Sequence, residues 1–382
     1  MSHVVILGSA HPLRGGLSNY NERLALQFQR EGHKVTIYTF SLQYPSILFP
    51  GKSQYTDQPK PEELDIKVKV NSVNPLNWLT VGNEIKNFKP DLLIIKFWLP
   101  FMGPCFGTIA RQVKKNGHTR VITIIDNIIP HEKRIGDKAF ANYFTKPVDA
   151  FITMSDSVLR DLDQFDTKKP RLMTLHPIYD NFGNAVSKEQ ARKELGLPAD
   201  EKILLFFGFI RDYKGLDLLL KALADERLKG NNVKAMIAGE FYCDPEPYEK
   251  LIKDLDLEPQ LYRFMDFIPD DKVGLYFCAS DMVVQPYKHA TQSGVTQICY
   301  HFDKPMLVTD VGGLAEIVPD GKVGYVTQPE PADIARAIDD FYSYEREAEM
   351  VSNIQEEKKR FAWEVLTEKI FSLEAEIRGK SS

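Results

Sequence analysis

Apolar residues along this chain gather in short continuous runs, each followed by a stretch whose apolar positions recur at helical spacing. Continuous runs predict strands covered on both faces, because a strand with one wet face would alternate apolar and polar residues. Strands that alternate with helices favour right-handed crossovers and a parallel sheet. The predicted strands are residues 4–7, 34–40, 92–97, 121–125 and 150–154 in the first half, and 203–207, 233–238, 261–268, 281–285 and 306–309 in the second.

The length of the chain and the grouping of these runs predict two domains. A chain of 382 residues is longer than one hydrophobic core usually supports. We therefore expect an α/β protein with two doubly wound parallel sheets, the first domain being residues 1–180 and the second residues 181–355. Residues 344–377 are charged and helical with widely spaced apolar anchors, so we expect the final segment, residues 356–382, to pack back over the first domain.

One turn joins a buried strand directly to glycine and positive charge. Gly208 follows the run 203–207, Arg211 and Lys214 supply cations, and Gly215 opens a helix with leucines on one face. Free N–H groups, the helix dipole and two cations converge there, which is typical of a phosphate site. The alternative is that both cations are ordinary solvated charges on a surface turn.

The same device recurs elsewhere in the chain. Gly15 and Gly16 close the loop after the first strand and precede a helix. Residues 286–297 are small and polar before a helix expected to begin at Ile298, and residues 310–316 repeat the glycine turn. Successive N–H groups in such turns form cradles for anionic oxygens.

Three further features of the sequence indicate the kind of partner and the cellular compartment: the net charge, the spacing of the cysteines and the first residues of the chain. The formal net charge of −5 gives no basic excess for a polyanion, so we expect no nucleic-acid partner. The four cysteines are far apart, and the N-terminal apolar run has only strand length without a charged n-region. These features predict a cytoplasmic protein with reduced thiols.

Two further loops leave the first sheet at strand ends. Residues 126–132 crowd two acids, an amide and an imidazole, which indicates either an acceptor-binding, proton-handling loop or an Asx turn capping a helix. The apolar loop 96–103 either folds onto the core or lies against a lipid. In the lipid hypothesis it acts with a mixed group of cations and aromatic residues, typical of a peripheral membrane contact: Lys133, Arg134, Lys138, Phe140, Tyr143, Phe144 and Lys146.

Taken in order, these landmarks resemble a retaining glycosyltransferase of the GT-B fold, in the large GT4 group. The resemblance covers most of the chain. It is carried by Gly15-Gly16, the G-x-x-R-x-x-K-G motif from Gly208 to Gly215, Ala238-Gly239, Ser280-Asp281, and Thr309-Asp310-Val311-Gly312-Gly313 leading to Glu316.

The resemblance implies two Rossmann-like domains facing a cleft, and a co-substrate that is a nucleotide-diphosphate sugar. It implies a saccharide or lipid-linked acceptor bound by the first domain, and a role in polysaccharide or glycolipid biosynthesis. The catalytic residues would be Arg211 and Lys214, which offset charge on the leaving diphosphate, so no metal and no enzymic nucleophile are expected. Donor-binding residues would be Gly15, Gly16, Gly208, Gly239, Glu240, Gln292, Ser293, Gly294, Thr296, Gln297 and Glu316, and acceptor-binding residues Asp126, Asn127, His131 and Glu132.

One feature departs from the family pattern. The family usually carries two glutamates eight positions apart before the penultimate strand, and this region has neither of them. Gln297 stands near the second position and residues 291–294 near the first. Two alternative enzymes could use the same fold, a sugar-nucleotide epimerase or a phosphorylase. A third alternative is a non-catalytic sugar-binding protein. The two Asp-x-Asp triplets, 161–163 and 254–256, lie in predicted helices and are read as solvated faces, not metal ligands.

Overall fold

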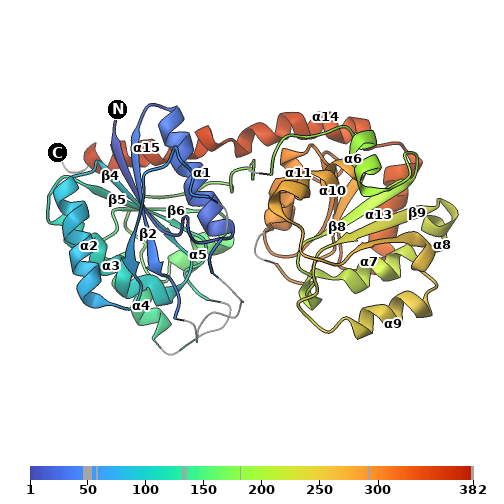
Figure 1. Ribbon diagram of the computed structural model, residues 1–382, viewed down its shortest axis with the longest axis horizontal. Helices are drawn as coiled ribbons and strands as arrows, with labels where there is room; N and C mark the ends of the chain where they lie inside the picture. Colours follow the sequence, from blue (N-terminus) through green and yellow to red (C-terminus); the bar gives the residue numbers. More distant parts are fainter. Residues whose placement is uncertain are drawn as a thin grey trace. The chain divides into compact units, whose positions relative to one another are not determined.

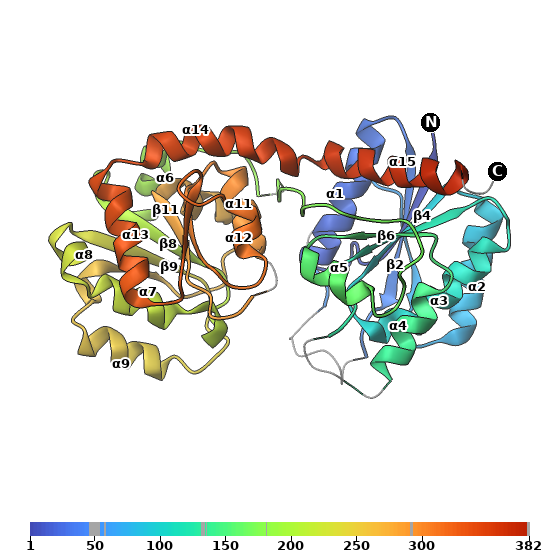
Figure 2. The same ribbon diagram turned by 180° about the vertical axis from the view of Figure 1, so that it is seen from behind.

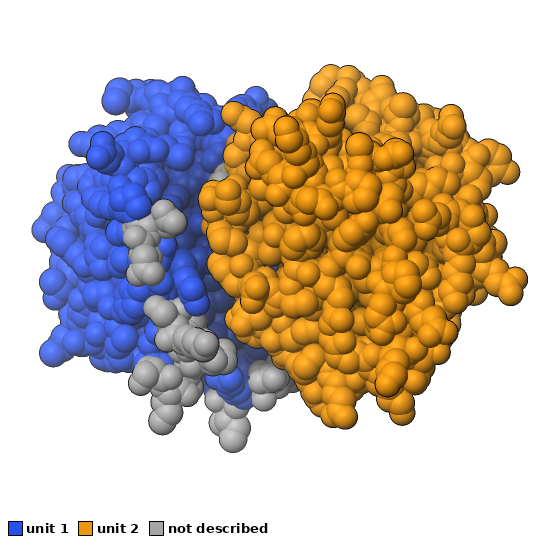
Figure 3. Space-filling view, turned by 45° about the vertical axis from the view of Figure 1, so that its right-hand side comes forward, with its two compact units in different colours: residues 1–175, 363–382 blue, residues 176–362 orange. Residues whose placement is uncertain are grey.

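The computed structural model describes residues 1–45, 54–56, 59–130, 134, 136–180, 182–290 and 293–379. The chain divides into two compact units, which are coloured separately in Figure 3. Unit 1 is Met1–Leu175 with Trp363–Ser382, and unit 2 is His176–Ala362. The chain therefore passes between units at 175/176 and 362/363, not at the expected 180/181 and 355/356.

Unit 1 is built on a seven-stranded sheet in the order β3-β2-β1-β4-β5-β6-β7, and every neighbouring pair is parallel. Helices cover both faces (Figure 1). The strands are β1 His3–Leu7, β2 Lys34–Leu42, β3 Ile66–Asn71, β4 Leu92–Phe97, β5 Arg120–Ile125, β6 Ala150–Thr153 and β7 Arg171–Met173. The helices are α1 Gly16–Arg30, α2 Pro75–Phe88, η2 Pro100–Met102, α3 Gly103–Lys114, α4 Asp137–Thr145, α5 Asp156–Leu162 and α15 Trp363–Gly379.

Each central strand of unit 1 contributes to two cores, because its successive side chains point to opposite faces. Val5 and Leu7 of β1 pack with α2 and α3, whereas Val4 and Ile6 pack with α1 and α15. The last helix, α15, lies beside α1 in Figure 2, and the ring of Trp363 contacts that of Tyr20 at a tilt, with centroids 5.1 Å apart. The prediction that the C-terminal helix returns to the first domain is confirmed.

Unit 2 repeats the plan with a six-stranded parallel sheet in the order β10-β9-β8-β11-β12-β13. Its strands are β8 Lys202–Phe207, β9 Val233–Ala238, β10 Leu261–Phe264, β11 Met282–Gln285, β12 Met306–Thr309 and β13 Gly324–Thr327. Its helices are α6 Lys188–Leu195, η3 Asp212–Lys214, α7 Leu216–Leu223, α8 Glu226–Gly230, α9 Glu246–Asp254, η4 Glu258–Gln260, η5 Asp270–Lys272, α10 Val273–Ala279, α11 Gly294–His301, α12 Leu314–Ile317, α13 Pro331–Ser343, α14 Glu347–Glu357 and η6 Lys358–Phe361.

Several predicted boundaries were wrong. The strand expected over residues 261–268 ends at Phe264, and the helix expected from Ile298 already begins at Gly294. The C-terminal helix is broken at Ala362, whose extended backbone separates η6 from α15. The three strands that were missed all lack a long, fully buried run and are β3, β7 and β13.

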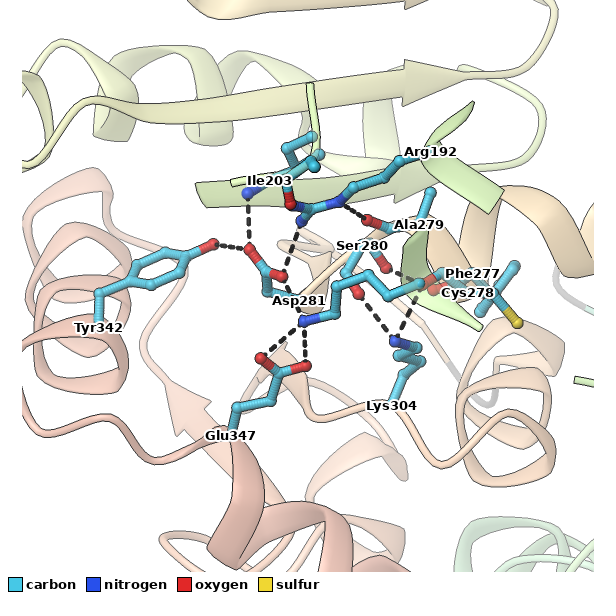
Figure 4. Close-up of polar contacts among 12 residues, drawn as sticks. Arg192, Ile203, Phe277, Cys278, Ala279, Ser280, Asp281, Lys304, Tyr342 and Glu347 are labelled. Atoms are coloured by element: carbon cyan, nitrogen blue, oxygen red, sulfur yellow. Dashed lines mark hydrogen bonds and ion pairs between the residues drawn. The ribbon is translucent and has the colours of Figure 1, made fainter. Parts of the chain in front are cut away.

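A buried carboxylate ties together the amino ends of the two central strands of unit 2 (Figure 4). Asp281, just before β11, accepts hydrogen bonds from Arg192 Nη2 at 2.9 Å and Lys188 Nζ at 2.7 Å, both on α6. It also accepts from the backbone N–H of Ile203 at 2.7 Å and the hydroxyl of Tyr342 at 3.2 Å. Ser280-Asp281, part of the family pattern, thus fixes the sheet at the end opposite its glycine turns.

Candidate functional site

The predicted phosphate turn lies where the strand order of unit 2 reverses. From β8 the sheet continues through β9 and β10 on one side and through β11, β12 and β13 on the other. Loops that follow β8 and β11 therefore leave the sheet in opposite directions, which is where doubly wound sheets bind ligands. We call residues 208–215 the donor turn.

Glycine is required in the donor turn by its backbone and by its neighbours. Gly208 and Gly215 have φ values of 94° and 69°, in the left-handed region that other residues rarely adopt. A Cβ on Gly215 would clash with the carbonyl oxygen of Pro286, which follows β11. A Cβ on Gly239, after β9, would clash with the carbonyl of Gly208. The turns after β8, β9 and β11 are thus in direct contact.

Lys214 is a mostly buried cation that lacks a counter-ion. Its Nζ lies 3.0 Å from where a Cβ of Gly208 would stand and 5.8 Å from the ring centroid of Tyr287. In the described ranges, no carboxylate forms an ion pair with Lys214. Burial, and then the charge of Arg211, lowers the pKa of Lys214 to about 8. A buried charge is costly unless it is paired, so this position favours an anionic ligand.

Arg211 is the second cation of the donor turn and is exposed. Its guanidinium carbon lies 5.4 Å from the ring centroid of Tyr242, and Arg211 has no ion pair within the part of the chain that the structure describes. Lys288 differs, since its Nζ contacts Asp212 at 2.7 Å and Asp217 at 2.9 Å. The two family-motif cations are therefore the ones left for a ligand.

The amino end of α11 joins this site through Tyr287. Ser293 caps α11 by accepting a hydrogen bond from Val295 N, and its hydroxyl donates to Gln285 Oε1 at 2.6 Å. Because that proton is committed, Tyr287 donates to Ser293 Oγ over 3.4 Å. A continuous series of contacts therefore leads from Lys214 to the N-terminus of α11, the kind of position that binds anions.

Two buried glutamines near this helix end have unused polar atoms. Gln285 accepts from the hydroxyls of Ser293 and Thr296 through Oε1, which fixes its amide orientation and leaves Nε2 without a partner among the described residues. The Oε1 of Gln297 on α11 also has no partner in the part of the chain that the structure describes, and the side chains of Gln285 and Gln297 are both 1% exposed. Unsatisfied buried amides cost stability and are suited to a polar ligand.

The other predicted donor-binding residues of unit 2 lie around the donor turn and the amino end of α11. Gly294 begins α11 and packs against the ring of Tyr179, and Thr296 is fully buried behind it. The backbone of Glu240 pairs with the donor turn, its carbonyl accepting from Ile210 N at 2.8 Å. Glu316 lies exposed on α12, after β12. Gln292 lies outside the described residues.

Gly15 and Gly16 occupy the corresponding position of unit 1. They end the loop after β1, and the strand order of that sheet also reverses there, between β1 and β4. Gly15 has a φ of 106° and precedes α1, and a Cβ placed on it would meet nothing within 4 Å in the described chain. The conformation, not crowding, requires this glycine.

Asp126, predicted to bind the acceptor, has a structural partner that the sequence did not reveal. Its Oδ1 accepts from Lys96 Nζ at 2.7 Å, and that ammonium also lies 3.5 Å from the ring centroid of Tyr20. Lys96 is fully buried at the end of β4, and burial lowers its pKa. Asp126 therefore neutralises a buried lysine. Asn127 follows half-buried, while His131 and Glu132 lie outside the described residues.

The apolar loop after β4 folds largely onto the core. Phe97, Pro100 and Met102 are buried, and Phe144 of α4 stacks on Phe97 with ring centroids 4.1 Å apart. None of the described helices is both long and apolar enough to cross a bilayer. The described residues also contain no cluster of three or more His, Cys, Asp or Glu side chains suited to a metal ion.

Family comparisons agree with this geometry. The model described as Glycosyl transferases group 1 matches residues 187–360, and the model described as Glycosyltransferase Family 4 matches residues 14–180. The D-inositol 3-phosphate glycosyltransferase of Streptomyces avermitilis is 31% identical over 188 residues, 46% of this chain and 40% of that protein. The protein of the same name from Corynebacterium efficiens is 26% identical over 243 residues, 60% and 56% of the two chains. The chain thus spans about half the length of the curated relatives it matches.

Solved structures resemble the whole chain. A glycosyltransferase from Rickettsia africae has a TM-score of 0.73 at 16% identity, with 98% of each chain covered. The Anabaena protein Alr3699/HepE, solved in complex with UDP, has a TM-score of 0.71 at 17% identity, with 97% of this chain and 99% of that chain covered. At such identities the likeness shows the fold.

Two doubly wound parallel domains, each with a glycine turn where its strand order reverses, define the GT-B class. Within that class the chain belongs to the GT4-type glycosyltransferases, whose two family models between them cover most of its length.

Proposed function

We propose that this protein transfers a glycosyl group from a nucleoside-diphosphate sugar to a hydroxyl acceptor with retention of anomeric configuration. The observation that carries the proposal is the mostly buried ammonium of Lys214 beside Arg211 in the donor turn, for which the described residues supply no carboxylate partner. Family membership supports the reaction type, and the expected retention follows from the family resemblance.

The cations of the donor turn would act on the leaving group. As the bond between the anomeric carbon and the diphosphate oxygen breaks, negative charge grows on the diphosphate, and Lys214 and Arg211 stabilise it. The acceptor oxygen bonds to the anomeric carbon, and its proton passes to the departing diphosphate. Preorganised cations of this kind contribute about 3–4 kcal/mol per group in other enzymes.

The donor can be identified before the acceptor. A thermal-shift screen of nucleoside diphosphates and their sugar conjugates should raise the melting temperature for the matching nucleotide, because binding to the folded state stabilises it by mass action. D-inositol 3-phosphate is the first acceptor to test, given the name of the relatives; saccharide and lipid-linked acceptors follow. Melting temperatures that no nucleotide changes would contradict the proposal.

An epimerase would use the same fold without an acceptor. Labelled nucleotide sugar incubated with the protein alone should be recovered unchanged if the protein is a transferase, and converted to an epimer if it is not. Transfer should also survive EDTA, because the two cations take the part that a divalent metal plays elsewhere. Loss of transfer in EDTA that Mg²⁺ restores would refute metal independence.

The last part of the proposal is that the protein acts in polysaccharide or glycolipid synthesis at the inner face of a membrane. It rests on α4, where Phe140 and Tyr143 are 39% and 38% exposed between the exposed residues Lys138 and Lys146. Amphipathic faces of this kind bind anionic bilayers. Flotation with anionic vesicles should carry the wild type and leave Phe140→Ser/Tyr143→Ser behind. A wild type that stays at the bottom of the gradient removes the membrane contact.

A further inference from the structure

Three exposed aromatic side chains gather beside the donor turn. Phe209, Tyr242 and Phe267 are 39%, 52% and 55% exposed, and they follow β8, β9 and β10, three neighbouring strands. Phe209 lies 4.3 Å from Tyr242 and 6.4 Å from Phe267, measured between ring centroids, and the latter pair is stacked at 28°. We call these three residues the aromatic surface.

The backbone explains why these rings share a side with Arg211. Beyond the sheet, the turns after β8 and β9 stay paired, because Ile210 N donates to Glu240 O and Tyr242 N donates to Ile210 O. In an extended segment alternate side chains point to opposite sides. Ile210 is fully buried in the core, so its neighbours Phe209 and Arg211 point the other way. Tyr242 lies between them, 5.4 Å from the guanidinium of Arg211.

A single exposed aromatic residue on a soluble protein needs no explanation. Tyr344, 69% exposed, is such a case in the same unit. Three exposed rings that meet at Phe209 are different, because together they present an apolar area next to Arg211. No carboxylate among the described residues pairs with either cation of the donor turn. The matching ligand carries a planar ring and an anionic group on one short linker. A nucleotide has this chemistry.

We propose that the aromatic surface stacks against the nucleobase of the donor. The inference rests on the proposed function, since it assigns a further part of the same ligand. Stacking on an aromatic face tolerates any base, because every base has a π-face. The aromatic surface therefore contributes affinity for the nucleoside and leaves the choice of base to other groups.

The test compares ligands with and without a base on the full-length chain. Titration calorimetry measures the Kd of inorganic diphosphate and of UDP, GDP, ADP and dTDP for wild type, Tyr242→Ala, Phe267→Ala and the control Tyr344→Ala. Base stacking contributes about 1–3 kcal/mol per base, so each site variant should bind the preferred nucleoside diphosphate roughly 5- to 150-fold more weakly. Inorganic diphosphate and Tyr344→Ala should show less than about a twofold change, because neither involves a stacked ring.

Conservative variants keep the result interpretable if an alanine variant unfolds. Tyr242→Phe and Phe267→Tyr preserve the ring faces and should keep wild-type affinity. Saturation-transfer NMR on the wild type should transfer magnetisation from protein aromatic protons most strongly to the base protons. Weak transfer to the base, or equal losses for inorganic diphosphate and nucleotide, would overturn the stacking.

Two outcomes separate this inference from the proposed function. If wild type and both alanine variants bind the nucleoside diphosphate equally, the stacking is wrong and the proposed function stands. If the wild type binds no nucleoside diphosphate, the proposed function fails and the stacking fails with it. A higher acceptor KM in the variants with unchanged nucleotide Kd would assign the rings to the acceptor and also overturn the inference.

Discussion

The ammonium of Lys214 lies 5.8 Å from the ring centroid of Tyr287, and Tyr287 in turn contacts the cap of α11. A cation held against a buried ring is stabilised less than one held against a carboxylate. Burial, and then the charge of Arg211, lowers the pKa of Lys214 to about 8. The unliganded protein thus carries a destabilising charge at the position where a diphosphate would neutralise it.

Lys214→Met should therefore separate stability from activity. Transfer should fall about 10²- to 10³-fold, because a group that stabilises the leaving charge is lost. The unliganded protein should become more stable by about 1–3 kcal/mol at pH 7, because a desolvated cation is removed. Initial rates and thermal unfolding measure the two effects.

The matched control is Lys288→Met, in the loop after β11 that contacts the donor turn through Lys288 N and Tyr213 O. Lys288 is paired with Asp212 and Asp217, which raise its pKa, so its loss removes a favourable cation from both carboxylates and leaves Asp217 paired, among the described residues, with Lys221 alone. The melting temperature should not rise in this variant. If Lys214→Met also melts no higher than wild type, the ammonium is not a destabilising charge in the free protein.

Nucleotide affinity should depend on pH through Lys214. The group is charged below its pKa of about 8 and neutral above it, and a bound diphosphate favours the charged form. The Kd for a nucleoside diphosphate should stay level from pH 7 to about 8 and then rise up to tenfold per pH unit, since only the protonated protein binds well. Arginine stays charged over this range, so Lys214→Arg should give a flat profile. A flat wild-type profile would contradict a lysine with a lowered pKa in the site.

The sequence could predict the fold because its central strands are covered on both faces. Residues 92–97 and 233–238 are apolar except for one lysine each, Lys96 and Lys234, and they match β4 and β9 without a boundary error. In β3 the lysines Lys67 and Lys69 interrupt the apolar positions, and they contact Glu84 on α2. A search for apolar runs could not find a strand whose outer face is stabilised by ion pairs.

The same limit applies to the candidate site. Gly208, Arg211, Lys214 and Gly215 form one local turn, so their spacing was visible in the sequence. Gln285, Tyr287 and the aromatic surface join that turn from segments distant in the chain, and only the strand order brings them together. That no carboxylate of the described residues pairs with Lys214 is likewise a three-dimensional property. A glutamine ending the run before Pro286 was the only sequence signal for Gln285.

Asp126 offers a test between a structural and an acceptor-binding role. Asp126→Ala would leave the buried Lys96 ammonium without its carboxylate, so the protein should lose about 3–5 kcal/mol of stability. Lys96→Met/Asp126→Ala should recover most of that loss, because no unpaired charge remains. Thermal unfolding of the two variants measures the effect.

Transfer kinetics of the double variant then decide the role of Asp126. A normal acceptor KM would assign Asp126 to the pair with Lys96 alone. A raised acceptor KM in a protein of restored stability would support the predicted acceptor contact. Equal stability of the single and double variants would contradict the pairing seen in the structure.

Gln285 should position the amino end of α11 for the donor. Gln285→Met keeps the side-chain volume but removes the acceptor for Ser293 and Thr296 and the unused Nε2 donor. Each lost hydrogen bond is worth about 0.5–1.5 kcal/mol, so nucleoside-diphosphate affinity should fall roughly tenfold with a small change in melting temperature. Gln260→Met is the matched control, because the buried Oε1 of Gln260 also has no partner among the described residues. Gln260 lies on η4, before β10, and so at the opposite end of the sheet from the donor turn. Calorimetry should show no loss of affinity in that variant. Equal affinities of Gln285→Met and wild type would assign Gln285 to packing alone.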